Sequence, residues 1–457
     1  MHLKKFDHNY SRRYFLEQLS KGVIGAGVLA PLWPLIGHSA EIDKAYPEEL
    51  LSIEAYTKGA VKPGDVITAD NVEVVKDLLD PITYMQVKDH GRRIDIVEST
   101  RDVTRMFPHE YLEATLSHNG QARLDDTGNV VTQDGKPWIG GNPFPDAQTG
   151  AEAFTNLTIS WGRHDSSMYA VRDWDISPNG SLAYQYDFVW VEENTVARLG
   201  DPRPYIEGQE DLLRWQSVWF TGPNDVKGTS FLNIWQYDQR EFPELMGYLP
   251  AFKRVRRFPT NQRFEPLVPG MTLFLSDAWA AGDPFLTWGN YKVIDRKPML
   301  GSVSQNWHGD HPNWERPVHG GPEDQTFFDT AMELVPETLV VEAEPVGYPR
   351  SPVSKKRVWI DVRNMMYVAY VTYDRRGDIW KAFQPGYSLY EKGDLRFMDG
   401  DHTAWSWTYV HSYDSQTNRM SRFIPAREVR GGYKTGYNLG DIYNKYFTVQ
   451  AIRRLGV

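Results

Sequence analysis

The sequence predicts a mainly β (α+β) fold built around one large antiparallel sheet. Three observations lead to this fold class. Aromatic residues, which strands accommodate well, make up 13% of the chain. From Ser167 onward, many short runs alternate apolar and polar side chains. The runs are joined by turn sequences, with no low-complexity linker and no repeat of fixed period. We therefore expect one extended β architecture carrying short helices and long loops.

The composition limits the classes of partner. The chain has 457 residues, of which 41% are hydrophobic, and a formal net charge of -10. An acidic balance argues against nucleic acid or anionic lipid as the main partner, because both require a basic surface. Cysteine is absent. The sequence thus excludes disulfides, thiolate zinc sites and sulfur nucleophiles.

The N-terminus carries the pattern of an export signal. Residues 11–16, SRRYFL, contain Arg12 and Arg13 in the order and spacing of a twin-arginine motif, followed by an apolar run over residues 22–36. That run is too short, and too interrupted by proline, to span a membrane. We expect residues 1–40 to be a signal peptide that sends the folded protein to the periplasm, with no transmembrane segment in the mature chain.

Residues 41–118 predict a helical and loop segment before the main domain. Thr68, Asp70 and Asn71 offer N-caps for a helix over residues 72–79, which Pro81 ends. Residues 119–457 are then expected to form a single extended β-rich domain. Within it, residues 140–145 are too rich in glycine and proline for regular structure.

The alternation of apolar and polar residues predicts where the strands lie. Residues 167–174 and 181–192 flank a turn at 177–180 and predict a β-hairpin, whose second strand carries an aromatic stripe on one face. Residues 207–215 predict a short helix, and residues 228–237 and 253–257 predict strands. Short strands forming an antiparallel meander are expected at residues 338–344, 357–361, 366–373 and 378–383.

Three stretches together resemble a known family. They are residues 140–156, GGNPFPDAQTGAEAFTN; residues 235–279, with WQYD, FKRVRRFP and SDAW in order; and KRVWID at 356–361 with YDRRGDIWK at 373–381. This set is similar to the outer membrane lipoprotein-sorting proteins, the domain of unknown function 1329. The resemblance implies a fold like the periplasmic Lol lipoprotein carriers: a curved, incompletely closed antiparallel barrel, or half-barrel, whose apolar concave face is covered by helices and loops. The family's activity is not established.

A curved sheet lined by rings offers a binding groove, because each square ångström of apolar surface removed from water contributes about 25 cal/mol. The alternative is that the same rings only fill the core. The candidate lining residues are Tyr186, Phe188, Trp190, Trp235, Tyr237, Tyr367 and Val371.

A basic run interrupts this acidic chain at residues 253–257. In a strand, Arg254 and Arg256 share one face. They are candidates for contact with an anionic group, since arginine binds such groups bidentately. The alternative is an edge strand protected by charge.

A histidine-rich loop follows at residues 307–321, WHGDHPNWERPVHGG. His308, Asp310, His311 and His319 are oxygen and nitrogen donors that suit zinc, manganese or iron. The alternative is a surface loop ordered by its tryptophans. His164 and Asp165 form a further candidate acid–base pair, but no nucleophile or cofactor motif accompanies them.

The leading hypothesis is a periplasmic protein that binds or carries a hydrophobic, lipid-like or sterol-like molecule, with an envelope exporter or transport complex as its candidate partner. It needs no cofactor and no catalytic residue. The alternative is a metal-dependent enzyme or a glycan-binding protein that uses the loop from His308 to His319 and surface aromatic residues. A third hypothesis is an assembly partner that docks onto an exporter.

Overall fold

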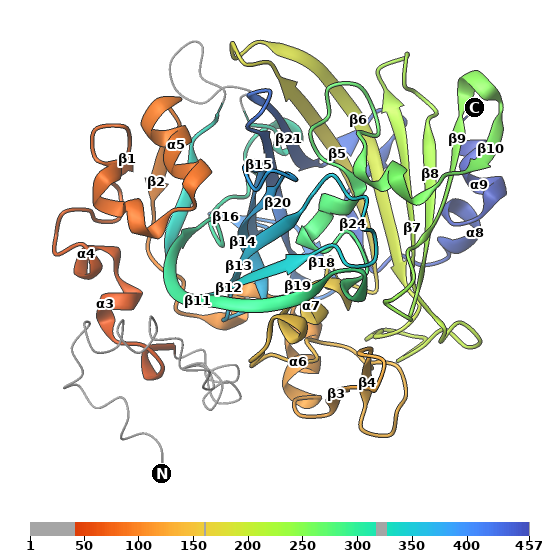
Figure 1. Ribbon diagram of the computed structural model, residues 1–457, viewed down its shortest axis with the longest axis horizontal. Coiled ribbons are helices and arrows are strands. Elements are labelled where there is room, and N and C mark those ends of the chain that lie inside the picture. The colour runs from red at the N-terminus through yellow and green to blue at the C-terminus, as the bar shows by residue number, and fades with distance from the viewer. Residues whose placement is uncertain (1–41, 160, 317–326, 457) are drawn as a thin grey trace.

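The computed structural model describes residues 42–159, 161–316 and 327–456, and one large curved sheet dominates it (Figure 1). The sheet has sixteen strands in the order β1-β2-β12-β13-β14-β15-β20-β21-β5-β6-β7-β8-β9-β10, with β11 beside β12 and β24 beside β5. Adjacent strands in the sheet pair antiparallel, except that β2 runs parallel to β12. The predicted signal peptide, including Arg12 and Arg13, lies outside the described residues.

The strands of the sheet fall into two halves. One half comprises β1 (Val66–Ile67), β2 (Ile94–Ile96), β11 (Gly289–Gly301), β12 (Thr330–Glu344), β13 (Lys355–Asp361), β14 (Met366–Tyr373) and β15 (Ile379–Leu389). The other comprises β20 (Trp405–Asp414), β21 (Arg419–Ala426), β24 (Gly436–Tyr437), β5 (Ser166–Ile176), β6 (Leu182–Asn194), β7 (Leu212–Gly222), β8 (Ser230–Gln236), β9 (Glu244–Leu249) and β10 (Arg254–Arg257).

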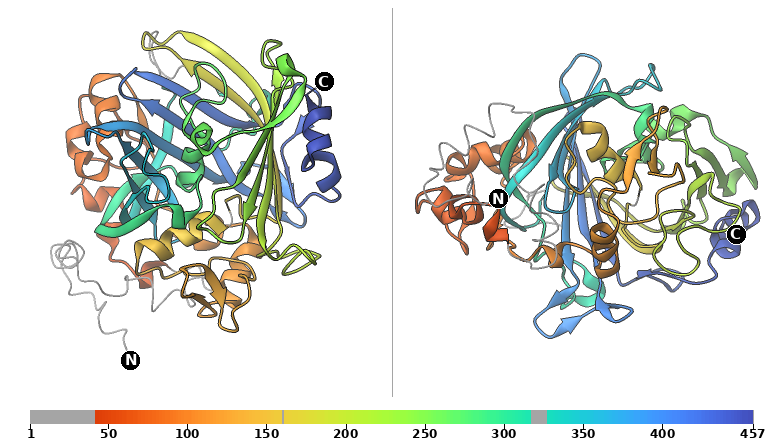
Figure 2. Two further views of the ribbon diagram at one scale, coloured as in Figure 1. Left: turned by 45° about the vertical axis from the view of Figure 1, so that its right-hand side comes forward. Right: turned by 90° about the horizontal axis from the view of Figure 1, so that it is seen from below.

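The sheet curves but stays open. In the described part of the chain, its end strands β1 and β10 do not pair with each other. The strands bend around a centre that holds helices and loops, as the two views in Figure 2 show. The predicted fold class, a mainly β protein with a curved and incompletely closed sheet under helices and loops, is confirmed. The parallel pairing of β2 with β12 is the departure from a purely antiparallel sheet.

Short helices cover both faces of the sheet. The N-terminal elements are η3 (Ile42–Lys44), α3 (Glu48–Leu51), α4 (Ile53–Tyr56), η4 (Val72–Leu78), α5 (Pro81–Asp89), η5 (Val103–Met106) and α6 (His109–Ser117). The centre holds α7 (Gly150–Ile159), η7 (Thr260–Phe264), η8 (Leu275–Ala280) and η9 (Phe285–Thr287). Beside the second half of the sheet, from β20 to β10, lie η6 (Pro250–Phe252), η10 (Pro312–Trp314), α8 (Tyr443–Tyr446) and α9 (Val449–Leu455). Small two-stranded sheets form the loop tips: β3 (Ala122–Leu124) with β4 (Val130–Thr132), β16 (Glu391–Lys392) with β17 (Leu395–Arg396), β18 (Met398–Asp399) with β19 (His402–Thr403), and β22 (Glu428–Val429) with β23 (Tyr433–Lys434).

The predicted hairpin is present as β5 and β6, which pair antiparallel with Val171 opposite Phe188. Residues 207–215 were expected to be helical, but strand β7 begins at Leu212. Pairing on both sides, with β6 and β8, outweighs the weak helix propensity of this stretch.

Pro81 ends one helix and starts another. It follows η4 and occupies the first turn of α5, where its missing N–H costs nothing. The side chain of Asp80 accepts hydrogen bonds from the backbone N–H groups of Ile82 and Thr83, both at 3.0 Å. An N-cap of this kind explains why α5 begins directly after the proline.

The two faces of the sheet have different partners. The inner face, which carries Tyr169, Phe188 and Tyr367, packs against α7 and against residues 267–281. The outer face is covered in one half by residues 42–118 and in the other by α8 and α9. Figure 1 shows these two outer covers at opposite sides of the molecule.

Candidate functional site

A cavity of about 70 Å³ lies on the inner face of the sheet. Apolar and aromatic side chains make up nearly all of its wall, and Asp277 is its one carboxylate. The wall consists of Tyr169, Val171, Phe188, Trp190, Val218, Phe220, Leu267, Met271, Leu273, Asp277, Ala278, Trp279, Tyr367, Phe383, Trp407, Val410 and Phe423.

Strand register explains how this wall forms. Tyr169, Trp190 and Val218 stand side by side on β5, β6 and β7. Val171 and Phe188 form the next cross-strand pair, beside Phe220. Because side chains two residues apart share a face of a strand, these rows line one continuous surface. β14, β15, β20 and β21 complete the wall from the other half of the sheet.

Residues 267–281, the cover segment, close the cavity. Single hydrogen bonds from the sheet hold this segment along its length. The Tyr186 hydroxyl donates to the carbonyl of Pro269 at 2.7 Å. The Thr272 backbone N–H donates to Ser421 Oγ at 2.8 Å, and the Thr272 hydroxyl donates to the carbonyl of Ser412 at 2.7 Å.

A buried ion pair anchors the far end of the cover segment. Lys381 Nζ on β15 lies 2.8 Å from Asp277 Oδ2, and both side chains are almost completely buried. Burial raises the pKa of Asp277 and lowers the pKa of Lys381, while each charge partly offsets the effect on the other. The hydroxyl of Tyr370 donates a further bond to the carbonyl of Asp277.

Lys356 provides a second cationic anchor. Its Nζ donates to the carbonyl of Ala280 at 2.8 Å and lies 3.9 Å from the centroid of the Trp288 ring. Burial lowers the pKa of Lys356 to about 7. Trp279 and Ala280 are both left-handed, with φ of 56° and 59°. A residue other than glycine keeps this conformation only when its surroundings hold it, and here the bonds from Lys356 and Lys381 do so.

Two buried carboxyl groups lie on the inner face beyond the cavity. Asp173 and Asp175 continue the stripe of Tyr169 and Val171 along β5. Burial raises the pKa of Asp173 well above its usual range and the pKa of Asp175 to about 7. The Ser421 hydroxyl donates to Asp175, which ties this end of the stripe to the anchor of Thr272.

The structure brings together part of the predicted groove. Phe188, Trp190 and Tyr367 line the cavity. Tyr186 belongs to the same hydrophobic cluster and holds the cover segment through Pro269.

Val371 faces the outer side of the sheet, unlike Tyr367 on the same strand. Trp359 is opposite Ala369 and Ile360 is opposite Tyr367, so Val368 is an extra residue in β14. This β-bulge reverses the alternation and turns Val371 toward the N-terminal cover.

Trp235 and Tyr237 belong to a neighbouring cluster rather than to the cavity wall. Trp235 packs edge-on against Trp161, with ring centroids 5.0 Å apart. The Tyr237 hydroxyl accepts from the backbone N–H of Trp138 at 2.7 Å and donates to the carbonyl of Val130 at 2.5 Å. Tyr237 therefore holds the loop that precedes α7, while Trp235 packs against the segment that follows it.

Arg254 and Arg256 lie on β10, the strand at the open end of the sheet, and both are exposed. The Arg256 guanidinium lies 4.5 Å from the ring centroid of Phe252. β10 contributes nothing to the cavity wall.

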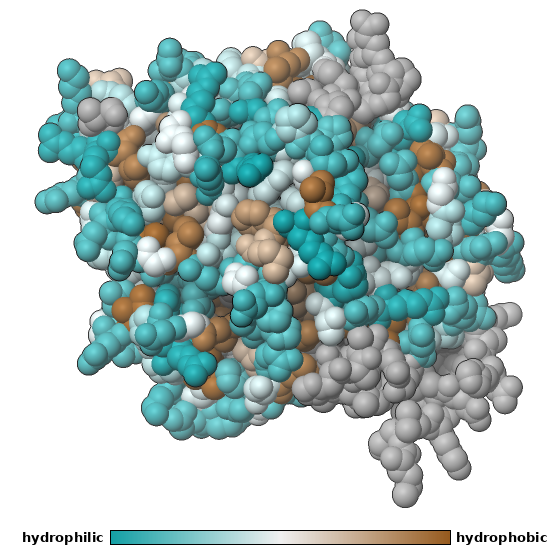
Figure 3. Space-filling view, turned by 180° about the vertical axis from the view of Figure 1, so that it is seen from behind, coloured by the Kyte–Doolittle hydropathy of each residue, from teal (hydrophilic) through white to brown (hydrophobic). Residues whose placement is uncertain are grey.

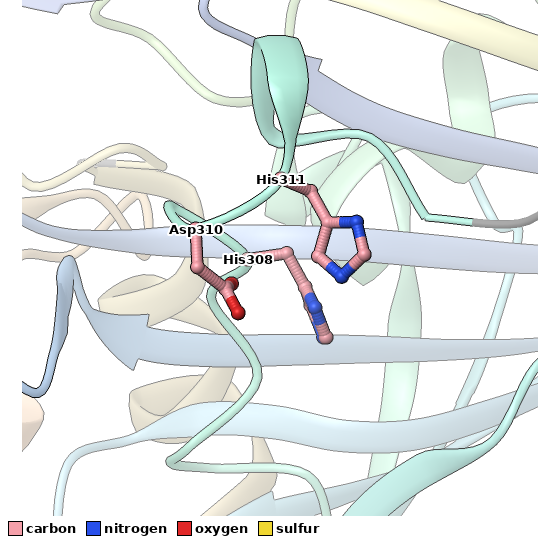
Figure 4. A group of neighbouring side chains, drawn as sticks. All are labelled: His308, Asp310 and His311. Carbon is pink, nitrogen blue, oxygen red and sulfur yellow. The ribbon is translucent and has the colours of Figure 1, made fainter.

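The histidine loop places three of its four predicted donors together (Figure 4). One ligand atom each from His308, Asp310 and His311 lies within 4.8 Å of the others. His319 lies outside the described residues. Lys392 Nζ lies 2.9 Å from Asp310 Oδ1. Burial, with Arg316 and Lys392 nearby, lowers the pKa of His308 to about 3, so its imidazole is neutral.

His164 and Asp165 point to different partners. His164 Nδ1 lies 3.2 Å from Asp399 Oδ2, and its ring stacks on Tyr437 at 4.2 Å. Asp165 accepts from the backbone N–H groups of Leu199 and Gly200. The predicted acid–base pair is therefore not formed.

The anchors of the cover segment were not identified from sequence. Asp277, Lys356 and Lys381 all lie within the three stretches that carry the family resemblance, and that was the available signal. On the face seen in Figure 3, hydrophobic residues form small separate patches among hydrophilic ones. None of the helices in the described residues is long and apolar enough to cross a membrane.

Comparison with solved structures finds several similar proteins. A putative outer membrane lipoprotein-sorting protein domain from Vibrio parahaemolyticus is 16% identical, with 67% of this chain and 97% of that chain covered and a TM-score of 0.41. A DUF1329 family protein from Desulfovibrio piger is 13% identical, with 66% and 97% covered and a TM-score of 0.43. A LolA superfamily protein from Nitrosomonas europaea is 14% identical, with 61% and 91% covered and a TM-score of 0.34.

No curated protein matches the chain. The family model described as a protein of unknown function, DUF1329, matches residues 66–453. The match confirms the resemblance drawn from the three sequence stretches, and the chain belongs to the DUF1329 family.

Proposed function

We propose that this protein binds and carries a hydrophobic, lipid-like molecule in the periplasm. The observation that carries the proposal is the apolar cavity of the inner face under a segment held by single polar bonds. Apolar walls supply affinity, and a detachable cover supplies entry and release. The twin-arginine motif at residues 11–16 supports the periplasmic location.

The small size of the cavity determines how a ligand can enter it. About 70 Å³ is less than half of the roughly 150 Å³ of an engineered apolar cavity that binds benzene. A lipid-like ligand therefore enters only when residues 267–281 move away from the sheet. The closed form is the empty carrier, and the ligand takes the place of the apolar side chains of the cover.

Native mass spectrometry of the exported protein tests this proposal. We expect a mass excess that is removed by organic extraction and matches a lipid. Val410→Phe fills the cavity and should lower the bound fraction tenfold or more, whereas Val74→Phe, on the exposed surface of η4, should not. A wild-type protein with nothing enriched over a control periplasmic protein would remove the proposal.

The exposed edge at β10 is the proposed contact with an anionic group or an envelope transport complex. Arg254 and Arg256 give this end of an acidic protein a local positive charge. Crosslinking in cells should capture a membrane complex through this edge, and the variant with both arginines changed to glutamine should lose it.

A metal-dependent activity or glycan binding is the second candidate function, and the donor group of His308, Asp310 and His311 favours it. Imidazoles and a carboxylate suit zinc. Less than about a tenth of an equivalent of metal in the purified protein, together with no glycan binding, would eliminate this candidate.

A further inference from the structure

A buried polar row borders the apolar cavity on the inner face. Ser167, Glu192, Gln216 and Asn233 stand opposite one another on β5, β6, β7 and β8. The neighbouring row along the strands, Tyr169, Trp190 and Val218, lines the cavity. All four polar side chains are at least 96% buried, although nothing in a sheet core requires a polar row there.

The row offers hydrogen-bond donors that the protein itself does not use. In the described ranges, no partner of good geometry is present for Gln216 Nε2 or Asn233 Nδ2, whereas the Tyr169 hydroxyl and Ser167 Oγ interact with each other. Buried polar groups are normally satisfied, so this concentration beside a cavity calls for an acceptor. The Tyr169 ring lines the cavity, which links the apolar wall to the row.

Three oxygen atoms of this region converge on Gly162. A Cβ at this position would lie 2.5 Å from the Tyr169 hydroxyl, 2.8 Å from Ser167 Oγ and 3.1 Å from Glu192 Oε1. These oxygen atoms therefore pack directly against the backbone of Gly162, and any larger residue would displace them.

Arg214 adds a positive charge at the same end. It lies two residues before Gln216 on β7 and shares its face. Its guanidinium lies 4.4 Å from the ring centroid of Trp161 and donates to the carbonyl of Thr158, while Nε and Nη1 have no partner in the described part of the chain. Burial lowers the pKa of Arg214 to about 10, so it remains charged at neutral pH. Burial raises the pKa of Glu192, which favours its neutral form.

We propose that the row of Ser167, Glu192, Gln216 and Asn233, with Arg214, binds the carboxylate of a fatty-acid-class ligand whose hydrocarbon chain lies along the cavity wall in place of the cover segment's side chains. The inference rests on the proposed carrier function and names its ligand class. An ionised carboxylate is an acceptor only, which matches unused donors and a guanidinium. The opposite end of the stripe carries the carboxyl groups of Asp173 and Asp175, which offer an anion no positive charge, so the ligand's carboxylate is expected at the Arg214 end.

The test compares three probes of equal chain length on the mature protein: dodecanoic acid, methyl dodecanoate and dodecanol. Calorimetric titration should give the acid at least tenfold tighter binding than either neutral probe. Gln216→Leu removes a donor at nearly constant volume and should lower acid affinity about tenfold with ester affinity unchanged. Gln185→Leu, on the exposed part of β6, is the matched control and should bind like the wild type.

The outcomes separate the two proposals. Equal binding of acid, ester and alcohol overturns the head-group inference and leaves the carrier function standing. Binding of none of the probes, to a protein that also yields no lipid extract, overturns both. If Gln216→Leu raises stability and leaves the acid preference intact, the row is structural and the inference fails. Arg214→Lys, which keeps the charge, should retain part of the preference.

Discussion

The covers on the two faces of the sheet are attached in different ways. The N-terminal cover, residues 42–118, joins the sheet as backbone, because β2 pairs with β12 and β1 pairs with β2. Its apolar side chains also complete two hydrophobic clusters. The cover segment, residues 267–281, has no strand pairing with the sheet in the described chain and is attached by side-chain bonds and by apolar contacts of residues such as Met271 and Leu275.

This difference in attachment implies that the two covers separate from the sheet at different costs in free energy. Water can replace a hydrogen bond, so each contributes only about 0.5–1.5 kcal/mol net. Water cannot replace buried apolar contacts at equal cost, and a strand ladder adds up several hydrogen bonds that must break together. Both covers bury apolar side chains, but only the outer cover also pairs with the sheet as strands, so we expect the inner cover to open locally at the lower free-energy cost.

The largest expected effect comes from the outer cover. Met106 is fully buried among residues of the N-terminal cover and the sheet. Met106→Ala should lower the free energy of unfolding by about 2–5 kcal/mol, because it leaves a cavity in a cluster that cannot open locally. Urea denaturation measures this. Leu395→Ala, at a residue 47% exposed, should change stability by less than about 0.5 kcal/mol.

Breaking the buried ion pair between Lys381 and Asp277 should loosen the cover segment rather than destabilise the whole fold. Lys381→Met leaves Asp277 buried without its cation, a change that costs about 3–5 kcal/mol if the cover stays closed. We expect the cover to open, with amide hydrogen exchange over residues 267–281 at least tenfold faster and exchange over residues 42–118 unchanged. Lys392→Met, at an exposed pair, is the control. Faster exchange in both covers would contradict the distinction between them.

The acidic end of the inner face predicts a pH dependence. Burial raises the pKa of Asp175 to about 7 in the folded protein, whereas in the unfolded chain this carboxyl titrates near pH 4. Between these values the folded state holds a proton that the unfolded state has lost. Its contribution to stability is therefore complete below about pH 4 and is lost as the pH rises toward 7.

Asp175→Asn should flatten this loss of stability between pH 5 and pH 7.5 in urea titrations. Asp173 lies on the same face with its own raised pKa, and Arg419 and Ser421 favour ionisation of Asp175. Asp126→Asn, at an exposed position, should keep the wild-type slope. An identical slope in both variants would place the pH dependence elsewhere.

The smallest effect is expected at the edge strand. Arg257 pairs with Glu244 on β9 at an exposed site. Arg257→Gln should change the free energy of unfolding by no more than about 0.5 kcal/mol, since exposed ion pairs contribute little. Thermal unfolding of the variant checks this, and a loss of several kcal/mol would show that this pair contributes more than an exposed ion pair does.

Local sequence patterns predicted some of the strands that line the cavity, but not the contacts that hold the cover segment over it. Alternation in residues 182–190 correctly placed Phe188 and Trp190 on one face, because the strand there is regular. The bulge at Val368, which moves Val371 away from Tyr367, depends on pairing with β13 and leaves no local signature. The link between His164 and Asp399 and the bond between Lys381 and Asp277 join distant segments, so only the folded chain reveals them.

The parallel pairing of β2 with β12 has a consequence for the order of folding. Ile94 lies beside Thr330, so this edge of the sheet cannot form until more than two thirds of the chain has left the ribosome. Contacts so distant along the chain slow folding, because the entropy of closing the loop is lost before the contact forms. We expect the N-terminal segment to wait, solvent-exposed, through most of synthesis, and a nascent chain cut before β12 to leave it open to protease.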